Sequence, residues 1–463
     1  MHISNLARLA AVLVVAASTA VARPVLDPDF GNDGFRLVSG VGNTQTAIGS
    51  CPTENGSLAV VGYDLGTSQF VILRLRPDGA LDASFSGDGV AYLPAPANLD
   101  PTNTVMSCQG VANGNASDDS IAVAIVENRA GTEPDFTRLA WFDLSTGEFS
   151  SGYAGQASRF ELSTAVTASP ALHNTRLGSV SRLPSGEWLL VGQLRNATQL
   201  PTRRAFVVRF NAAMTSAVLT GAPNRSGTDV EHIAVVRIGG DGRLHALAHG
   251  VSDGIRSLLH LRLFADTLLL DTVAAFPRTT GFSYELHRGR TMGGGRMVAA
   301  GTRLASFGGT QPFLVIARDA GIQEITLPQP APFGGLGAGI VSEGTGTPTA
   351  TSALGDRAIY VANVDTEQGP YGGYYVAAVQ LGDGAGVPDD IDLRFATQGS
   401  ATFRYTTQNG NCWNAQRLGN ISSWGATTAM VGSASPGCDS GTRQPLISRI
   451  DSDSNSILKD SFE

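Results

Sequence analysis

Two histidines on one expected hairpin are the residues in this sequence whose spacing best suggests chemistry. The segment VEHIAVVRIGGDGRLHALAHG (230–250) has the pattern of two strands joined by a tight turn at Gly240-Asp241. Pairing about that turn places His232 directly opposite His249, and side chains that face each other across two strands stand roughly 5 Å apart at Cβ. Two imidazoles at that separation could share a metal ion.

The same hairpin offers no third ligand. His245 shares the face of His249, but four residues along a strand correspond to roughly 13 Å. Strand alternation points Glu231 to the opposite face. We therefore favour a packed cross-strand histidine pair over a metal site, and we predict no metal, no cofactor and no catalytic residue.

Two further segments resemble functional motifs only in part. Gly437-Cys438-Asp439-Ser440-Gly441 is similar to the nucleophile segment of chymotrypsin-like proteases, but no matching histidine segment accompanies it, which favours a polar loop with a structural cysteine. Asp451-x-Asp453-x-Asn455 begins like a calcium loop. Ser456 replaces the required glycine and Phe462 the bidentate carboxylate, which excludes an EF-hand and leaves weak surface calcium binding open.

Composition restricts the architecture that could position these side chains. The 463 residues include 56 glycines and only 16% charged residues, which favours short strands and tight turns over long charged helices or coiled coils. A net charge of −8 disfavours a nucleic-acid partner. No apolar run reaches the length of roughly 18 residues expected of a membrane-spanning helix, so we expect no span.

A repeat with a period of about 62 residues organises the chain. Each copy has a turn, a short apolar frame and, after a polar loop, a second apolar segment rich in β-branched and aromatic residues, which is typical of strands. The seven frames are GSLAVVG (56–62), DSIAVAI (119–125), GEWLLVG (186–192), GRLHALA (242–248), GRMVAAG (295–301), DRAIYVA (356–362) and ATTAMVG (426–432).

A third motif adds strands to each unit. LDPDFGNDGFRLV (26–38), LDASFSGDGVAYL (81–93) and IDLRFATQGSATF (391–403) share an Asp, a Phe and a Gly ahead of another short strand. Four strands in each of seven units predict an all-β fold, a seven-bladed β-propeller with four antiparallel strands per blade. Pairing of Phe35 to Val38 with the C-terminal segment would close the ring and remove its exposed edges. An open solenoid or a sandwich is the alternative.

The string RLRPDGALDASFSGDGV (74–90), with VVGY upstream and LDPDFGNDG at residues 26–34, resembles the delta-60 repeat family of secreted bacterial proteins. The close similarity covers about the first 90 residues, and later units have diverged. The resemblance implies a propeller and export. It implies no catalytic residue, because that family has none assigned.

The N-terminal segment and the cysteines indicate an exported protein. Residues 1–22 combine Arg8, an apolar stretch and Ala20-Val21-Ala22, which predicts a cleaved signal peptide, with residues 23–463 forming a single propeller domain. Four cysteines in an oxidising compartment favour two local disulfides, Cys51 with Cys108 and Cys412 with Cys438, over buried free thiols. Lys459 is the only lysine among 32 basic residues, a bias that favours a bacterial source.

These patterns predict a secreted or periplasmic, non-catalytic propeller that acts as a monomer. It would serve as a binding or scaffold module through loops at the mouth of the central channel, with a protein, a glycan or an envelope component as its partner. The alternative is a secreted hydrolase or lyase whose site gathers carboxylates and histidines from several blades.

Overall fold

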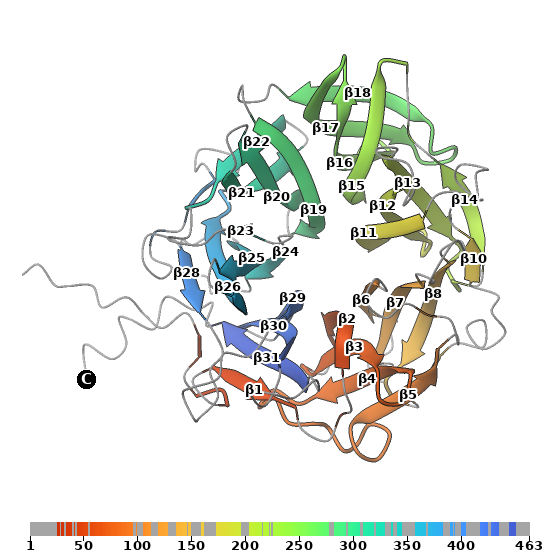
Figure 1. Ribbon diagram of the computed structural model, residues 1–463. Helices are drawn as coiled ribbons and strands as arrows, with labels where there is room; N and C mark the ends of the chain where they lie inside the picture. The colour runs from red at the N-terminus through yellow and green to blue at the C-terminus, as the bar shows by residue number, and fades with distance from the viewer. Residues whose placement is uncertain are drawn as a thin grey trace, which may run out of the picture.

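The computed structural model describes a chain built from β-strands arranged around a central axis (Figure 1). The described residues are 26–27, 29–31, 34–38, 41, 44–53, 56–95, 99, 105–112, 119–127, 136–145, 147–149, 159–161, 173–195, 203–214, 216–221, 223, 226–276, 282–292, 295–305, 309–318, 321–328, 335–336, 340–344, 357–366, 369–382, 389–391, 393, 400–403, 417–424, 427–434 and 444–450. Within these ranges, no helix has the length and apolar character that a membrane crossing requires.

Each repeated apolar frame forms the second strand of its own sheet, and the second apolar segment forms the third. The frame strands are β3 (Leu58–Asp64), β7 (Asp119–Glu127), β12 (Trp188–Arg195), β16 (Arg243–Ser252), β20 (Arg296–Ala305), β25 (Arg357–Thr366) and β30 (Thr427–Ala434). The third strands are β4 (Gln69–Leu75), β8 (Phe136–Asp143), β13 (Arg203–Phe210), β17 (Ile255–Phe264), β21 (Gly309–Arg318), β26 (Gly369–Gln380) and β31 (Gln444–Ile450). Their side chains are buried on both faces, because neighbouring sheets pack face to face.

The strand that precedes each frame lies nearest the centre of the ring (Figure 1). The continuous innermost strands are β2 (Thr44–Pro52), β6 (Val105–Ala112), β11 (His173–Arg182), β15 (Thr228–Ile238), β19 (Phe282–Met292) and β29 (Arg417–Trp424). The outer strands are β1 (Phe35–Leu37), β5 (Val90–Pro94), β9 (Glu148–Phe149), β10 (Arg159–Glu161), β14 (Ala217–Gly221), β18 (Leu270–Phe276), β22 (Gly321–Thr326), β27 (Asp390–Ile391) and β28 (Ser400–Phe403).

The all-β propeller class is confirmed, but the prediction of seven blades with four strands each is wrong. Six blades, defined as sheets with one continuous innermost strand, occur in the described residues. The remaining sheet has six strands, and its inner edge is divided into β23 (Gly335–Leu336) and β24 (Ile340–Gly344), which both pair with β25.

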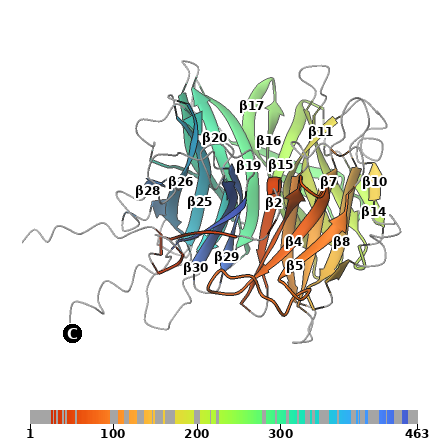
Figure 2. The same cartoon turned by 60° about the horizontal axis from the view of Figure 1, so that its bottom comes forward.

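The two ends of the described chain meet in one sheet. β1 pairs antiparallel with β31, with Phe35 opposite Ser448 and Leu37 opposite Leu446. Arg449 Nε donates to Asp27 Oδ2 at 2.6 Å and adds an ion pair to this junction. The predicted closure of the ring by the N-terminal strand is confirmed (Figure 1). Figure 2 shows β29 and β30 of this last sheet beside β2 of the first blade.

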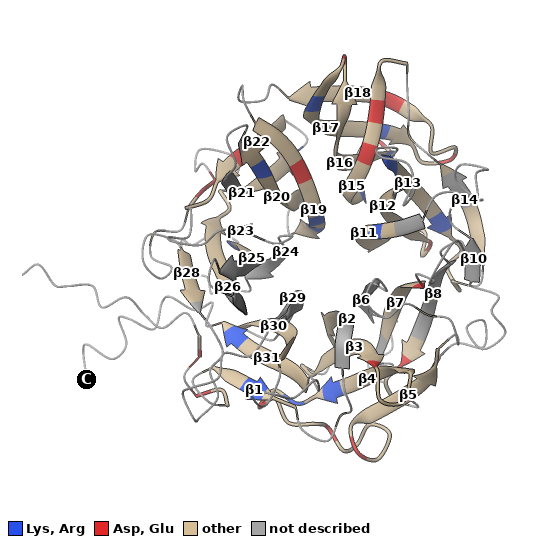
Figure 3. Cartoon of the chain, in the orientation of Figure 1, with Lys and Arg blue, Asp and Glu red and all other residues tan. Residues whose placement is uncertain are grey.

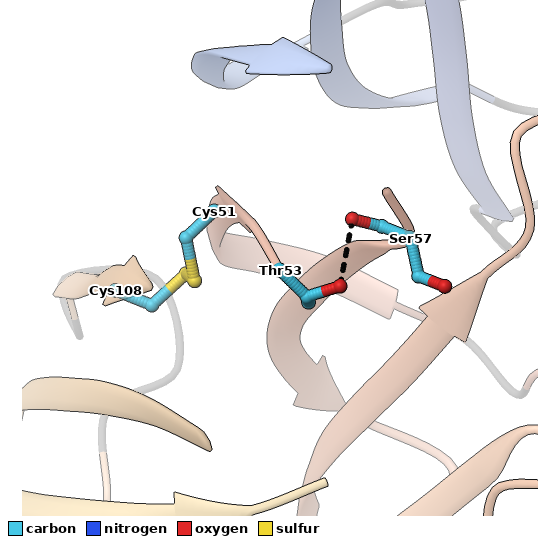
Figure 4. Close-up of a disulfide and its surroundings, with 4 residues drawn as sticks. All are labelled: Cys51, Thr53, Ser57 and Cys108. Atoms are coloured by element: carbon cyan, nitrogen blue, oxygen red, sulfur yellow. Dashed lines mark hydrogen bonds between the residues drawn. A yellow bond between two sulfur atoms is a disulfide. The ribbon is translucent and has the colours of Figure 1, made fainter. Parts of the chain in front are cut away.

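A disulfide joins the inner edges of the first two blades. Cys51 on β2 and Cys108 on β6 are bonded, with their Cα atoms 5.6 Å apart, as the local pairing predicted (Figure 4). Both cysteines are buried, and the Thr53 hydroxyl closes the following turn by donating to the Ser57 carbonyl at 3.1 Å. The second predicted bridge, Cys412 with Cys438, lies outside the described residues.

Innermost strands approach each other closely on both sides of β15. A Cβ added at Gly178 of β11 would lie 2.0 Å from the Ile233 carbonyl oxygen, and one at Gly289 of β19 would lie 2.8 Å from Val235. Only glycine lets these backbones come so near. The side chains of β11, β15 and β19 therefore converge on one part of the channel.

Candidate functional site

Three charged residues occupy the same position on three successive innermost strands. Arg176, Glu231 and Glu285 are each the fourth residue of their strand, on β11, β15 and β19 respectively. Because innermost strands of successive blades run in the same direction, these residues lie at the same end of the channel. Figure 3 shows a basic band on β11 and acidic bands on β15 and β19. With Arg203 and Arg256 they form what we call the channel cluster.

Glu285 links two blades that are not neighbours. Arg176 Nη1 donates to Glu285 Oε1 at 2.8 Å, so that this ion pair spans the β15 blade between them. Arg203, at the start of β13, places its Nη1 3.7 Å from the same oxygen. The side chain of Arg176 remains 41% exposed and those of Glu285 and Arg203 about a quarter exposed. Two guanidinium groups therefore face one carboxylate at a surface that solvent reaches.

Glu231 has an inward position that strand alternation did not predict. A register shift between Val230 and His232 marks a bulge at this residue. The Glu231 carboxylate accepts two hydrogen bonds from Arg256 Nη2, at 2.8 and 2.6 Å, and lies 3.7 Å from His249 Nε2. The expectation that Glu231 points away from the histidine pair is therefore wrong, because a bulge changes the direction of the residue it inserts.

Three buried histidines lie beneath the channel cluster, and we call them the histidine trio. His232 is paired with His249 in the β15–β16 register, as predicted, and their ring centroids are 5.5 Å apart. The third member, His287, comes from β19 of the next blade, and its carbonyl lies 2.5 Å from His232 Nε2. Buried histidines from two neighbouring blades are therefore in contact with each other.

Hydrogen bonds fix the protonation of these rings. The Leu286 N–H donates to His249 Nδ1 at 3.0 Å, so the neutral ring carries its proton on Nε2, which faces Glu231. His232 Nε2 donates to the His287 carbonyl. His287 Nε2 lies 2.9 Å from the Thr302 hydroxyl. All three imidazoles are thus accommodated in their neutral form.

Burial and positive neighbours keep the trio neutral. Burial, with the Arg176 charge as a second cause, lowers the pKa of both His232 and His287 to about 3. Burial also holds the pKa of His249 well below its usual range, and His232 and Arg256 act in the same direction. On β19, burial and Arg176 lower the pKa of the partly buried Arg288 to about 10. Neighbouring arginine charges therefore add to burial in keeping the three rings neutral.

The trio does not assemble a metal centre. Among the residues that the structure describes, no group of three or more His, Cys, Asp or Glu side chains has an arrangement that could hold a metal ion. The proton of His249 Nε2 faces the nearest carboxylate, and His232 Nε2 is engaged with a backbone carbonyl. The arrangement favours a structural role, in which the buried histidines pack against the charged residues of the channel cluster.

A second histidine pair lies at the other end of the same hairpin. His245 Nδ1 lies 3.3 Å from His260 Nε2, and His245 Nε2 lies 3.1 Å from Asp241 Oδ1. Arg262 Nη2 donates to Asp241 Oδ2. His245, which the sequence placed apart from the His232–His249 pair, thus belongs to this separate hydrogen-bonded chain.

The remaining sequence candidates fall beyond what the structure describes. Both Gly437-Cys438-Asp439-Ser440-Gly441 and Asp451-x-Asp453-x-Asn455 lie outside the described ranges. Sequence reasoning missed Arg176, Arg203, His287 and Glu285 altogether. The available signal was a charged residue 10 or 11 positions before each of three successive frames, namely Arg176, Glu231 and Glu285. Using this signal requires the knowledge that these strands are innermost.

The fold defines the class of protein as a β-propeller. Residues 53–85 match the family described as domain of unknown function (DUF5122) beta-propeller, a match that covers one short stretch around β3 and β4. A comparison with curated proteins gives no significant match.

Solved structures with a similar fold have unrelated sequences. A protein of unknown function from Dyadobacter fermentans is 12% identical, with a TM-score of 0.42 over 90% of this chain and 99% of that one. The polysaccharide lyase Uly1 is 10% identical, with a TM-score of 0.49 over 95% and 96%. A GH93 alpha-L-arabinofuranosidase of Fusarium graminearum is 11% identical, with a TM-score of 0.43 over 76% and 95%. None of these similarities assigns an activity to this chain.

Proposed function

We propose that the protein is an exported, delta-60-type propeller that binds a ligand at the channel cluster without transforming it. One observation carries the proposal: both carboxylates of the cluster are held in ion pairs with arginines, above three imidazoles that are buried and neutral. General acid–base catalysis needs a group that exchanges protons near the working pH. Paired charges that are partly exposed are suited to recognition instead.

Export is part of the same proposal. The N-terminal segment 1–22 has the pattern of a signal peptide, and the Cys51–Cys108 disulfide is compatible with an oxidising compartment. We expect residues 23–463 to fold as one domain and to act as a monomer. The partner would be a glycan, a protein or another component of the cell envelope.

A second candidate is a hydrolase or lyase. The 3.7 Å approach of the Glu231 carboxylate to His249 Nε2 favours it, because a carboxylate beside an imidazole is a common acid–base arrangement. The side chains of His249 and Glu231 are, however, only 1% and 10% exposed, and Arg256 occupies both carboxylate oxygens. A substrate would have to displace that arginine to reach them.

A glycan-binding screen with recovery of the ligand separates the two candidates. Purified protein is applied to immobilised acidic and neutral oligosaccharides, and retained ligands are eluted and weighed by mass spectrometry. The binding proposal expects retention with unchanged ligand mass, weakened by R176Q and unaffected by the surface variant R76Q, since Arg76 lies in an exposed pair with Asp78. Shortened or unsaturated products, lost in E231Q, would establish the enzyme instead.

A further inference from the structure

The channel cluster carries more positive than negative charge, although the chain as a whole is acidic. Within the described residues, the cluster has the two carboxylates of Glu231 and Glu285 and the three guanidinium groups of Arg176, Arg203 and Arg256, and Arg288 on β19 adds a fourth near Arg176, whereas the net charge of the protein is −8. An excess of guanidinium groups at one concave place attracts anions and is costly to keep without a counter-ion. This end of the channel is therefore suited to a negatively charged group.

Two of the four arginines have hydrogen-bonding capacity to spare. Arg176 uses Nη1 for its bond to Glu285. Arg203 Nη1 approaches Glu285 Oε1 only to 3.7 Å, which is beyond hydrogen-bond distance. Both side chains are partly exposed. A guanidinium presents five donors in a planar fork, so Arg176 and Arg203 can each donate to an oxygen of a ligand.

Glu285 shows which kind of anion fits. One oxygen of its carboxylate, Oε1, faces both guanidinium groups, at 2.8 Å from Arg176 Nη1 and 3.7 Å from Arg203 Nη1, so a carboxylate is a group that the two arginines already accommodate. Arg256, by contrast, donates from Nη2 to both oxygens of a different carboxylate, that of Glu231, at 2.8 and 2.6 Å. The pair that can take part in binding is thus Arg176 and Arg203.

We infer that Arg176 and Arg203 form the binding site for the carboxylate of an acidic ligand, and that Glu285 is an internal counter-ion which this carboxylate replaces. The inference rests on the proposed binding role and names the chemical group recognised. The pKa of His232 and His287 agrees with this assignment, because the Arg176 charge lowers it in addition to the larger effect of burial.

The two members of this ion pair should respond in opposite directions when each is neutralised. Removing the Arg176 charge with R176Q takes away a ligand donor, and R203Q does the same for the second guanidinium. Removing the Glu285 charge with E285Q leaves both arginines in place and eliminates the competing carboxylate. If the ion pair were purely structural, both the arginine variants and E285Q would weaken ligand binding or leave it unchanged.

The experiment is a calorimetric titration of the full chain with D-glucuronate, N-acetylalanine, D-glucose and inorganic phosphate at constant ionic strength. The sugar acid and the peptide-like acid distinguish a glycan source of the carboxylate from a protein source. We expect a carboxylate probe to bind, R176Q and R203Q to weaken its binding at least tenfold, and E285Q to tighten it at least threefold. R76Q changes the net charge equally at a remote exposed pair and serves as the matched control.

Thermal unfolding and near-ultraviolet circular dichroism of each variant establish that it is folded. If an arginine variant does not fold, E285Q alone decides, because a gain of affinity cannot arise from misfolding. Equal binding of D-glucose and D-glucuronate, or an unchanged or weaker affinity in E285Q, overturns the inference and leaves the binding role intact. Cleavage of a bound acidic oligosaccharide would overturn the binding role and leave the carboxylate preference standing.

Discussion

His232 lies directly opposite His249 across the β15–β16 hairpin, and both rings are completely buried beneath Glu231. The pair connects to the next blade through His287, whose carbonyl receives the His232 Nε2 proton. Ionisable side chains at a contact between blades make the stability of that contact depend on pH. The sign of the dependence follows from the direction of the pKa shifts.

Acidification should destabilise the protein from about pH 6.5 downward. The pKa of His232 and His287 is about 3 in the folded protein against an ordinary value of 6.5, so the unfolded chain takes up protons that the folded chain refuses. Between those values, each ring lowers the free energy of unfolding by about 1.4 kcal/mol for every unit by which the pH falls. The three rings of the trio together lower it by roughly 4 kcal/mol per unit. Full stability is present above pH 6.5. Urea titrations at pH 7, 6 and 5 measure the slope.

The variant H287N should reduce that slope by about 1.4 kcal/mol per pH unit, the contribution of one proton. One of the three rings is removed, while a polar side chain is kept. Ring proton resonances of the wild type should not titrate between pH 7 and 5. A ring of the trio that protonates near pH 6.5 in the folded protein would contradict the prediction.

Removing the Cys51–Cys108 disulfide should weaken the protein substantially. The two cysteines are separated by 57 residues, and the chain-entropy estimate for a loop of that length is about 4 kcal/mol. The double variant C51A/C108A should lose about 2–4 kcal/mol of unfolding free energy in urea titrations. A non-reducing peptide map of the wild type checks the bond and also tests the expected Cys412–Cys438 bridge. Unchanged stability of the double variant would show that the disulfide does not stabilise the folded protein.

Gly178→Ala should disturb the convergence of the innermost strands. A methyl group at this position would meet the Ile233 carbonyl oxygen at 2.0 Å, so β11 and β15 must separate, at a cost of about 1–3 kcal/mol. The matched control is Gly240→Ala in the β15–β16 turn, where a Cβ meets nothing within 4 Å. Differential scanning calorimetry should show a lower Tm for Gly178→Ala alone. Equal Tm values for both variants would mean that the strands are not in close contact.

Deleting residues 23–38 should open the ring. This deletion removes β1 and with it the backbone pairing to β31 and the Asp27–Arg449 ion pair. The exposed edge of β31 then presents unpaired N–H and C=O groups to other molecules. Light scattering should detect association that a chain beginning at residue 23 does not show. A monomeric, equally stable truncated chain would disprove the closing role of β1.

The strands were predictable because apolar frames with flanking turns are local signals. All seven frames became second strands, the turn at Gly240-Asp241 placed His232 against His249, and the Phe35–Val38 segment found its partner in β31. Cys51 and Cys108 could be paired because, of the possible connectivities of four cysteines, the local one joins adjacent units. Each of these inferences depends on spacing along one unit or between adjacent units.

The candidate site was not predictable, because it depends on relations that spacing does not encode. The bulge at Glu231 changes the direction of one side chain without any proline or glycine to announce it. Arg176 and Glu285 are 109 residues apart and meet only because β11 and β19 both converge on β15. The count of regular blades failed at residues 335–344, where an apolar frame follows but the innermost strand is divided.

The pairing of β1 with β31 also sets the order in which the molecule can be finished. A ribosome makes residue 35 more than four hundred residues before residue 448, so the last sheet must wait for nearly the whole polypeptide before its outermost strand has anything to dock onto. Until then each unit can fold on its neighbour, but the circle is incomplete. Any premature stop or C-terminal proteolysis before β31 therefore leaves the earliest strand of the protein without a partner.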